Sequence, residues 1–331
     1  MPHDVIYLSD ADVRSMLTMR AAVRAVEDDF KRQAEPDGMV LGVPLAWSTD
    51  DRQLGFRWRL KTVVIRGVPV AGVRVAGYKV DASGFGSGGE REATRYIILS
   101  DPNSGSPLAI IDEHSSFAVR TAASLTVAAK HLARRASKVV GIIGIGNVGR
   151  AALTGLAETF SLAEVRVISL RPETRTQFAR EASETLGLRV TACDTHEAVC
   201  RGADIIICAT IAREPFLEWD WLKEGVFIGA VGAEEVEHEV YRRCDRLFVD
   251  YDPRTEPHPE HINRAIAAGA IGQDNISGPL WETVCGAKPG RRNESDRILV
   301  CTVGLTSQDI SIAHALYEQA KTDGRGMRLP F

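Results

Sequence analysis

The chain has 331 residues, of which 44% are hydrophobic and 25% are charged, and its formal net charge is −4. This length is enough for two domains with large cores. The slightly acidic balance argues against a nucleic-acid partner, because nucleic-acid-binding proteins carry a basic excess or patch. No apolar run approaches the ~18 residues that a membrane helix needs, which argues against a membrane protein. Six scattered cysteines without a C-x-x-C pair are typical of reduced thiols in the cytoplasm.

The first third of the chain predicts two helices followed by an antiparallel sheet. Ser9 and Asp12 have the spacing of a capping box, and a second helix is expected to start after Thr18. A glycine-rich segment at 84–89 predicts a flexible loop. Strands are expected at residues 39–47, 54–65, 68–80, 93–99 and 108–111.

A long alanine-rich helix, from Ser115 to Arg134, is expected to lead into a second domain. There, a short apolar strand ends at Ile143, six residues form a G-x-G-x-x-G sequence, and a helix follows. Strand, glycine turn and helix in this order are what a dinucleotide-binding motif requires. The residues expected to contact the cofactor are Gly144, Gly146, Asn147, Val148 and Gly149.

Each glycine of this motif has a predicted role. Gly144 would allow the tight turn, Gly146 would let the backbone approach a pyrophosphate, and Gly149 would let the helix pack on the strand. The phosphates would lie at the N-terminus of the helix, where unpaired N–H groups and the helix dipole favour anions. The alternative is a glycine turn that only shapes the chain.

The end of the second strand indicates which dinucleotide binds. In NAD enzymes an acidic residue about 20 positions after the glycines binds the ribose 2′-hydroxyl, whereas an arginine there suits a 2′-phosphate. Here the strand ends without an acid, and Ser169, Arg171 and Arg175 stand in its place. We therefore favour NADP(H), with NAD(H) possible. The alternative is that both arginines are solvated residues at a helix start.

Beyond the glycine motif, strands and helices alternate, which predicts a doubly wound parallel sheet. Its further strands are expected at residues 165–170, 188–192, 203–209, 226–231, 246–249 and 298–302. A last helix, capped by Thr306 or Ser307, would pack on the first domain. We therefore expect an α/β protein with a Rossmann domain at 126–305 and an antiparallel α+β domain formed by 1–125 with 306–331.

Several segments resemble the ornithine cyclodeaminase/mu-crystallin family. The R-T-A-A sequence that begins at Arg120 precedes the glycine motif, as a similar sequence does in that family. The other similar segments are D-P-N-S-G at 101–105, the strand at 225–232, G-x-x-x-G-R at 286–291 and G-x-x-x-Q-D at 304–309. The resemblance extends from about residue 5 to 321 and is loosest in the first hundred residues.

The resemblance implies a homodimer joined through the antiparallel domain, with an amino or imino acid substrate between that sheet and the nicotinamide. It also implies hydride transfer at the substrate α-carbon. We therefore expect an NAD(P)H-dependent oxidoreductase that acts on an amino or imino acid. Two alternatives stay open: cyclodeaminase chemistry on ornithine with bound NAD⁺, and a catalytically weak NADPH-binding protein like mu-crystallin.

The resemblance also implies roles for individual residues. Arg120 would hold the substrate carboxylate, since a guanidinium offers it two parallel donors. Thr121 would contact the cofactor. Two later strand ends would complete the cofactor site at Ala209, Thr210, Val231 and Gly232.

Two residues are candidates for the proton donor. The family's lysine on the central strand is matched here by Arg74, which would bind substrate but effectively cannot release a proton. Lys79 would supply an amine, although its odd spacing from Arg74 puts it on the other strand face unless a bulge near Gly77 intervenes. Glu234 stands where cyclodeaminases carry an aspartate, and a solvated acidic loop is the alternative.

The first domain has no clear match to the family's substrate-binding arginine. Arg57 and Arg59, which alternate with Lys61 on one strand face, would replace it, or would form an exposed or subunit-contact face. The H-P-E-H sequence at 258–261 has no third ligand nearby in the sequence, so no metal site is expected.

Overall fold

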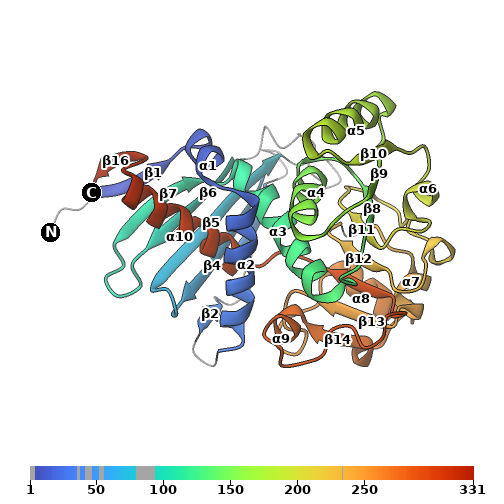
Figure 1. Ribbon diagram of the computed structural model, residues 1–331. Helices are drawn as coiled ribbons and strands as arrows, with labels where there is room; N and C mark the ends of the chain where they lie inside the picture. The colour runs from blue at the N-terminus through green and yellow to red at the C-terminus, as the bar shows by residue number, and fades with distance from the viewer. Residues whose placement is uncertain (1–3, 36–37, 42–46, 52–55, 80–93, 233) are drawn as a thin grey trace. The chain divides into compact units, whose positions relative to one another are not determined.

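The computed structural model describes residues 4–35, 38–41, 47–51, 56–79, 94–232 and 234–331 (Figure 1). The chain divides into two compact units, the first from residues 1–120 with 305–331 and the second from residues 121–304. Helix α3 (His114–Leu132) begins in the first unit and ends in the second. The glycine-rich segment at 84–89 lies outside the described residues.

The described residues of the first unit form an eight-stranded sheet in the order β16-β1-β7-β6-β5-β4-β2, with β3 also paired to β4. All of these pairs are antiparallel except β1 with β7. The strands are β1 (Asp4–Leu8), β2 (Met39–Leu41), β3 (Trp47–Asp51), β4 (Phe56–Ile65), β5 (Val70–Lys79), β6 (Thr94–Ser100), β7 (Pro107–Asp112) and β16 (Met327–Pro330). The antiparallel α+β fold expected for this part of the chain is confirmed.

Three helices belong to this sheet: α1 (Asp10–Met16), α2 (Met19–Gln33) and α10 (Thr306–Asp323). The capping box predicted at Ser9 and Asp12 is present, and Thr18 caps α2 through the backbone N–H of Ala21. Helix α10 lies directly on the sheet, because a Cβ added at Gly72 of β5 would meet Ile310 Cδ1 at 2.2 Å. A glycine in β5 therefore lets this helix approach.

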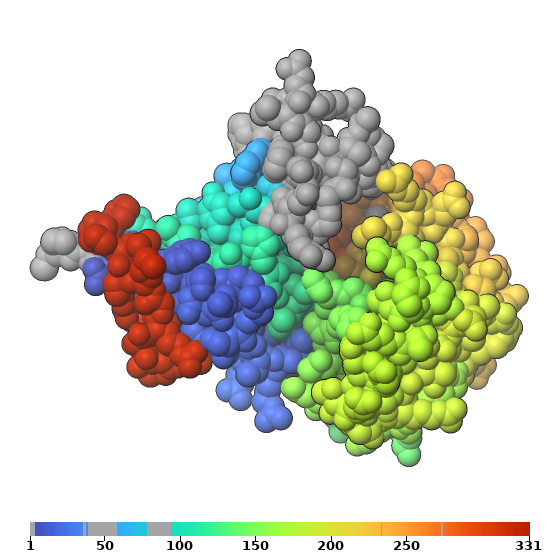
Figure 2. Space-filling view, turned by 90° about the horizontal axis from the view of Figure 1, so that it is seen from above, coloured from blue at the N-terminus to red at the C-terminus, as the bar shows by residue number. Residues whose placement is uncertain are grey.

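The two ends of the chain meet in this unit. In Figure 2 the C-terminal segment lies against the N-terminal helices, and α10 packs on α2. The fully buried Asp29 of α2 accepts hydrogen bonds from the hydroxyls of Ser307 at 2.8 Å and Ser311 at 3.0 Å, both in α10. Burial raises the pKa of Asp29 to about 6, against these hydrogen bonds.

The prediction that Thr306 or Ser307 caps α10 is wrong. The N-cap position is Leu305, which supplies no side-chain hydrogen bond, and the helix begins at Thr306. The Ser307 hydroxyl binds Asp29 instead of the backbone of its own helix. A contact between distant parts of the sequence therefore replaces the local cap.

The second unit contains a parallel sheet in the order β10-β9-β8-β11-β12-β15-β13-β14. Its strands are β8 (Val139–Ile143), β9 (Glu164–Ile168), β10 (Arg189–Ala192), β11 (Ile205–Cys208), β12 (Phe227–Ala230), β13 (Arg246–Val249), β14 (Ile276–Pro279) and β15 (Ile298–Cys301). Its helices are α4 (Asn147–Thr159), α5 (Pro172–Leu186), α6 (His196–Cys200), α7 (His238–Arg243), α8 (Glu260–Ala267) and α9 (Leu280–Val284). The chain crosses from one side of β8 to the other between β10 and β11, so β8 and β11 flank a topological switch point, where ligands of such sheets bind. The expected doubly wound fold is confirmed.

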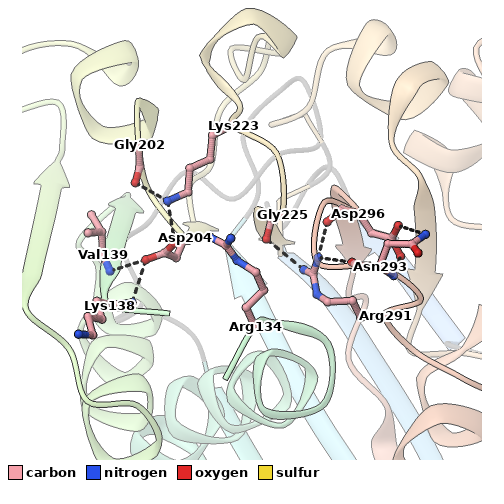
Figure 3. A network of polar contacts seen from close by, with 10 residues as sticks. All are labelled: Arg134, Lys138, Val139, Gly202, Asp204, Lys223, Gly225, Arg291, Asn293 and Asp296. Atoms are coloured by element: carbon pink, nitrogen blue, oxygen red, sulfur yellow. Dashed lines mark hydrogen bonds and ion pairs between the residues drawn. The ribbon is translucent and has the colours of Figure 1, made fainter. Parts of the chain in front are cut away.

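A buried carboxylate, Asp204, holds together the N-terminal ends of β8 and β11, at the end of the sheet away from the switch point (Figure 3). Asp204 accepts hydrogen bonds from the backbone N–H groups of Lys138 and Val139, from Arg134 at 2.6 Å and from Lys223 at 2.6 Å. Burial alone would raise the pKa of Asp204, but these donors outweigh it and lower the pKa to about 2. The ionised form of Asp204 is therefore stabilised at the N-terminal ends of β8 and β11.

Arg291 ties the neighbouring segments together in the same way (Figure 3). Its guanidinium donates to the backbone carbonyls of Leu132 at 3.0 Å, Gly225 at 3.1 Å and Asp296 at 2.5 Å. The end of α3 and the approaches to β12 and β15 are therefore joined by one side chain. The polar contacts at the N-terminal ends of these strands are thus structural, and ligands of doubly wound sheets bind at the opposite, C-terminal ends.

Candidate functional site

The glycine motif has the geometry that a dinucleotide loop needs. Gly144 directly follows β8 with φ +93°, and a Cβ there would lie 2.3 Å from the Ala209 carbonyl oxygen. A Cβ at Gly149 would lie 2.0 Å from the Gly144 carbonyl oxygen, so α4 packs against the turn itself. At Gly146, the N-cap of α4, a Cβ would meet nothing within 4 Å. The first and third glycines are thus required by packing, and the second borders open space.

The loop after β9 presents one arginine to solvent and uses the other internally. Arg175 donates to the Ser169 carbonyl at 3.3 Å and is ion-paired with Asp194, which follows β10. Arg171 is the N-cap residue of α5 and is exposed. Within the described residues the Arg171 guanidinium has no hydrogen bond or ion pair, so it is available to an anion.

The loops after β11 and β12 are joined by a residue that the sequence did not single out. Glu235 is 1% exposed, and its Oε1 accepts from the backbone N–H of Thr210 at 2.6 Å and from the Thr210 hydroxyl at 2.8 Å. Its Oε2 accepts from the backbone N–H groups of Val231 at 3.0 Å and Gly232 at 2.6 Å. Burial raises the pKa of Glu235, and the N–H donors oppose this effect. Glu235 therefore sets the shape of both strand ends that were expected to line the cofactor site.

The neighbouring acid, Glu234, has a different environment. It is ion-paired with Arg264 of α8, and its side chain is 25% exposed. The H-P-E-H sequence shares this partner, because Glu260 also pairs with Arg264, at 3.1 Å, while His258 contacts the Tyr251 hydroxyl at 2.8 Å. Among the described residues, no three His, Cys, Asp or Glu side chains lie close enough to bind a metal ion.

The first unit contains a buried cluster of charges. Arg74 of β5 binds Glu113 through Nε at 2.6 Å and lies 3.5 Å from Asp309 of α10. Arg120 of α3 binds the other oxygen of Asp309 through Nε at 2.5 Å. All four side chains are at most 6% exposed. Three separate segments of the chain, namely β5, residues 113–120 and α10, therefore meet at one ionic site.

An aromatic ring supports the cations of this cluster. The guanidinium carbons of Arg95, Arg120 and Arg74 lie 4.0, 5.3 and 5.5 Å from the centroid of the Phe117 ring, which is within cation–π distance. Burial and the nearby Asp309 raise the pKa of Glu113 to about 7, against the lowering effect of Arg74 and Arg120.

Arg120 is held by one part of its guanidinium only. Its Nε is bound to Asp309, whereas its two terminal nitrogens make no hydrogen bond within the described part of the chain and are not fully buried. Asp309 therefore fixes the position of Arg120 and leaves its two terminal nitrogens without a partner among the described residues. This is the half of a guanidinium that recognises a carboxylate.

The remaining first-unit candidates are partly described. Arg59 is exposed on β4, and for Arg57 and Lys79 the structure describes the backbone alone. The bulge near Gly77 that would change the face of Lys79 is absent, because β5 pairs with β4 without a register shift from Val70 to Lys79.

Sequence reasoning missed the carboxylates Glu113, Glu235 and Asp309. Asp309 belongs to the G-x-x-x-Q-D segment, and that segment was the available signal for it. Glu113 directly precedes α3, the helix that carries Arg120. No local signal separates Glu235 from the acidic residues around it.

The chain is similar to known proteins over almost its whole length. A family model described as "Ornithine cyclodeaminase/mu-crystallin family" matches residues 4–324. Alanine dehydrogenase of Archaeoglobus fulgidus is 28% identical over 336 residues, which cover 99% of each chain. No helix in the described residues is both long and apolar enough to span a membrane.

Two solved structures are similar over almost their whole length. The complex of Thermococcus litoralis Δ1-pyrroline-2-carboxylate reductase with NADH and L-proline has a TM-score of 0.88 at 27% identity and covers 98% of this chain and 100% of that one. An archaeal alanine dehydrogenase dimer with bound NAD has a TM-score of 0.89 at 25% identity and covers 99% and 100%.

Proposed function

Because the chain belongs to the ornithine cyclodeaminase/mu-crystallin family, we propose that it is a nicotinamide-dependent oxidoreductase that reduces an α-imino acid to the amino acid. The proposal rests mainly on the two adjacent residues Arg120 and Thr121 of helix α3. Its residue Arg120 presents two donors from a buried charge cluster, and the next residue, Thr121, begins the unit that contains the glycine loop. Both similar solved structures contain a nicotinamide dinucleotide, and the reductase also contains an amino acid.

The second unit would bind the cofactor through backbone and side-chain groups. The pyrophosphate would approach Gly146 at the N-terminus of α4, where a missing Cβ leaves room and unpaired N–H groups favour an anion. Leu170 and Ile211 are 97% and 95% exposed, and they follow the strands on either side of β8, so they would pack against the adenine. When bound, the reduced nicotinamide supplies a hydride to the imine carbon.

We further propose that NADP(H) is preferred over NAD(H). The strand end after β9 lacks the acidic residue that would bind a ribose 2′-hydroxyl. Arg171 is exposed there, with a guanidinium that makes no hydrogen bond or ion pair among the described residues. A 2′-phosphate is the group that this guanidinium would bind.

The first unit would bind the substrate. The two terminal nitrogens of Arg120 would form two parallel hydrogen bonds with the carboxylate, which fixes the orientation of the α-carbon. Asp309 is a positioning residue in this proposal, since it acts on substrate through Arg120. Glu234 and Lys79 stay candidates for proton transfer, and Arg57 and Arg59 for further contacts with substrate.

We also propose that two copies associate through the first sheet. Trp58 and Leu60 of β4 are 38% and 40% exposed, and alternation puts them on the face opposite to Arg59 and Lys61. Large apolar side chains exposed together mark a protein contact, and the similar alanine dehydrogenase is a dimer. We place this dimer in the cytoplasm, because all six cysteines are free thiols.

The proposal is tested by turnover and binding together. Purified protein is titrated with NADPH and NADH by fluorescence, and cofactor oxidation is then followed with cyclic imino acids and with linear 2-oxo acids plus an amine. Arg120→Ala should lower kcat/KM by ~100-fold or more, through the loss of a doubly hydrogen-bonded ion pair, and leave NADPH affinity unchanged. Full activity in this variant, or release of ammonia from ornithine without net cofactor oxidation, would contradict the proposal.

A further inference from the structure

The pairing of β4 with β5 puts an amine beside the charge cluster. In the antiparallel register, Lys61 of β4 is directly opposite Arg74 of β5. Directly opposite residues of an antiparallel pair project their side chains to the same face. Lys61 therefore lies on the face where Arg74 meets Glu113 and Asp309.

The surroundings of Lys61 are defined by charges from three other segments. Asp309 of α10, Arg120 of α3 and Arg74 of β5 all act on it, and Arg59 acts from its own strand. The side chain is half-buried, and within the described residues the Lys61 ammonium makes no hydrogen bond or ion pair. A cation that is desolvated in this way, within the electrostatic influence of Asp309 and Arg120, is available to a ligand.

We propose that Lys61 is the acid that protonates the imino nitrogen of the substrate. The inference rests on the proposed function and adds a catalytic residue to it. The strand register puts the Lys61 amine and the Arg74 guanidinium directly opposite each other on neighbouring strands. The face that carries the charge cluster therefore offers an amine as well as two guanidinium groups.

The step balances without a further reactant. An N–H bond of the Lys61 ammonium breaks, and a new N–H bond forms at the imino nitrogen. The carbon of the resulting iminium accepts a hydride from the reduced nicotinamide, which gives a neutral amine and oxidised cofactor. The neutral Lys61 amine then takes a proton from water.

The other polar groups of the cluster are less suited to this step. Arg74 stays protonated at any pH at which the protein is folded. Glu113 has one oxygen engaged by Arg74 at 2.6 Å and is 1% exposed, so it has little access to a ligand. Burial lowers the pKa of Lys61. The nearby arginines lower it further, and Asp309 opposes the shift. A pKa closer to neutral makes the ammonium a more efficient proton donor.

Three variants test the inference: Lys61→Met, Lys61→Arg and the matched control Lys31→Met. Lys31 is a half-exposed lysine of α2 in the same unit, paired only with Asp28 at 3.6 Å in the described residues. Lys61→Met and Lys61→Arg should each lower kcat with the imino acid by ~10²- to 10⁴-fold, whereas Lys31→Met should be indistinguishable from the wild type. NADPH affinity and melting temperature should not change in any of the three.

The pH profile separates proton donation from charge alone. In the wild type, kcat/KM should fall as the pH rises through the Lys61 pKa, because the ammonium is the active form. This limb should vanish in Lys61→Arg, whose guanidinium stays protonated, and should remain in Glu113→Gln. A limb that persists in Lys61→Arg, or disappears only in Glu113→Gln, would overturn the inference.

Chemical rescue and product binding distinguish a catalytic role of Lys61 from a purely structural one. Methylamine should restore part of the activity of Lys61→Ala, and Lys61→Arg should still bind L-proline or L-alanine in calorimetry with the oxidised cofactor. Wild-type activity in the Lys61 variants would refute the role of Lys61 and leave the reductase proposal standing. A wild-type protein that turns over no imino acid would instead refute the proposed function.

Discussion

Replacement of Gly146 by alanine distinguishes a nucleotide-binding loop from a glycine turn that only shapes the chain. Gly146 has φ −66° and ψ −171°, which alanine adopts readily, and a Cβ there would meet no atom within 4 Å. The free protein should therefore keep its unfolding free energy within ~0.5 kcal/mol. Gly149→Ala is the contrast, because its Cβ would lie 2.0 Å from a backbone oxygen and should destabilise the protein by ~1–3 kcal/mol or more.

Although Gly146→Ala should leave the stability of the free protein unchanged, it should strongly weaken cofactor binding. In the proposed site, the missing Cβ leaves the space that the pyrophosphate needs. At a concentration of 100 times Kd, a bound ligand adds ~2.7 kcal/mol of stability, which is a melting shift of about 5–10 °C for a domain of this size. The Gly146→Ala variant should lose almost all of this shift.

The assay is thermal unfolding of the wild type, Gly146→Ala and Gly149→Ala, each with and without NADPH. The expected result is a normal melting temperature without a cofactor-induced shift in Gly146→Ala, and a lowered melting temperature in Gly149→Ala. A full NADPH-induced shift in Gly146→Ala would show that the pyrophosphate does not approach this residue. The nucleotide site would then have to be sought elsewhere.

Three further substitutions test other parts of the structure. Arg171→Ser should weaken NADPH binding by ~10- to 100-fold, through loss of a charge-assisted hydrogen bond, and change NADH binding little; equal losses in fluorescence titrations would contradict a 2′-phosphate contact. The pKa of Asp29, about 6, lies above its ordinary 3.8, so its contribution to stability is complete below 3.8 and is lost as the pH rises through 6. Asp29→Asn does not ionise, so its unfolding free energy relative to the wild type should increase by up to ~3 kcal/mol between pH 4 and pH 8, and a constant difference in thermal unfolding would refute this. Glu235→Gln replaces one acceptor oxygen by a donor, so at least one buried N–H loses its partner; we expect a loss of ~1–3 kcal/mol and weaker cofactor binding, and unchanged values of both would show that the loops hold their shape without the carboxylate.

Features encoded within a few residues could be predicted from the sequence. The glycine loop, the capping box at Ser9 and the cap at Thr18 depend on neighbours within one turn of chain, and the structure contains all three. The strands from β4 to β13 follow from alternating patterns in the same way, whereas β14 and β16 were not predicted.

Features that depend on distant segments could not be predicted. Asp309 and Arg120 are 189 positions apart, and nothing local to either residue indicates their ion pair. Ser307 has the right type and place for a helix cap, yet the burial of Asp29 beside it takes its hydroxyl. Of the adjacent acids Glu234 and Glu235, the one that faces the loop amides is decided by the backbone path, which the sequence pattern does not reveal.

The split of the first unit between the two ends of the chain has a consequence for synthesis. The second unit is one continuous segment, residues 121–304, and has all its strands before the ribosome reaches α10. The first sheet must wait for α10 to cover its face and for β16 to pair with β1. Since domains fold as units during synthesis, the nucleotide-binding unit should be complete first, and the cluster around Arg120 forms only when Asp309 has emerged. If the two units bind cofactor and substrate as proposed, each molecule becomes able to bind cofactor before it becomes able to bind substrate.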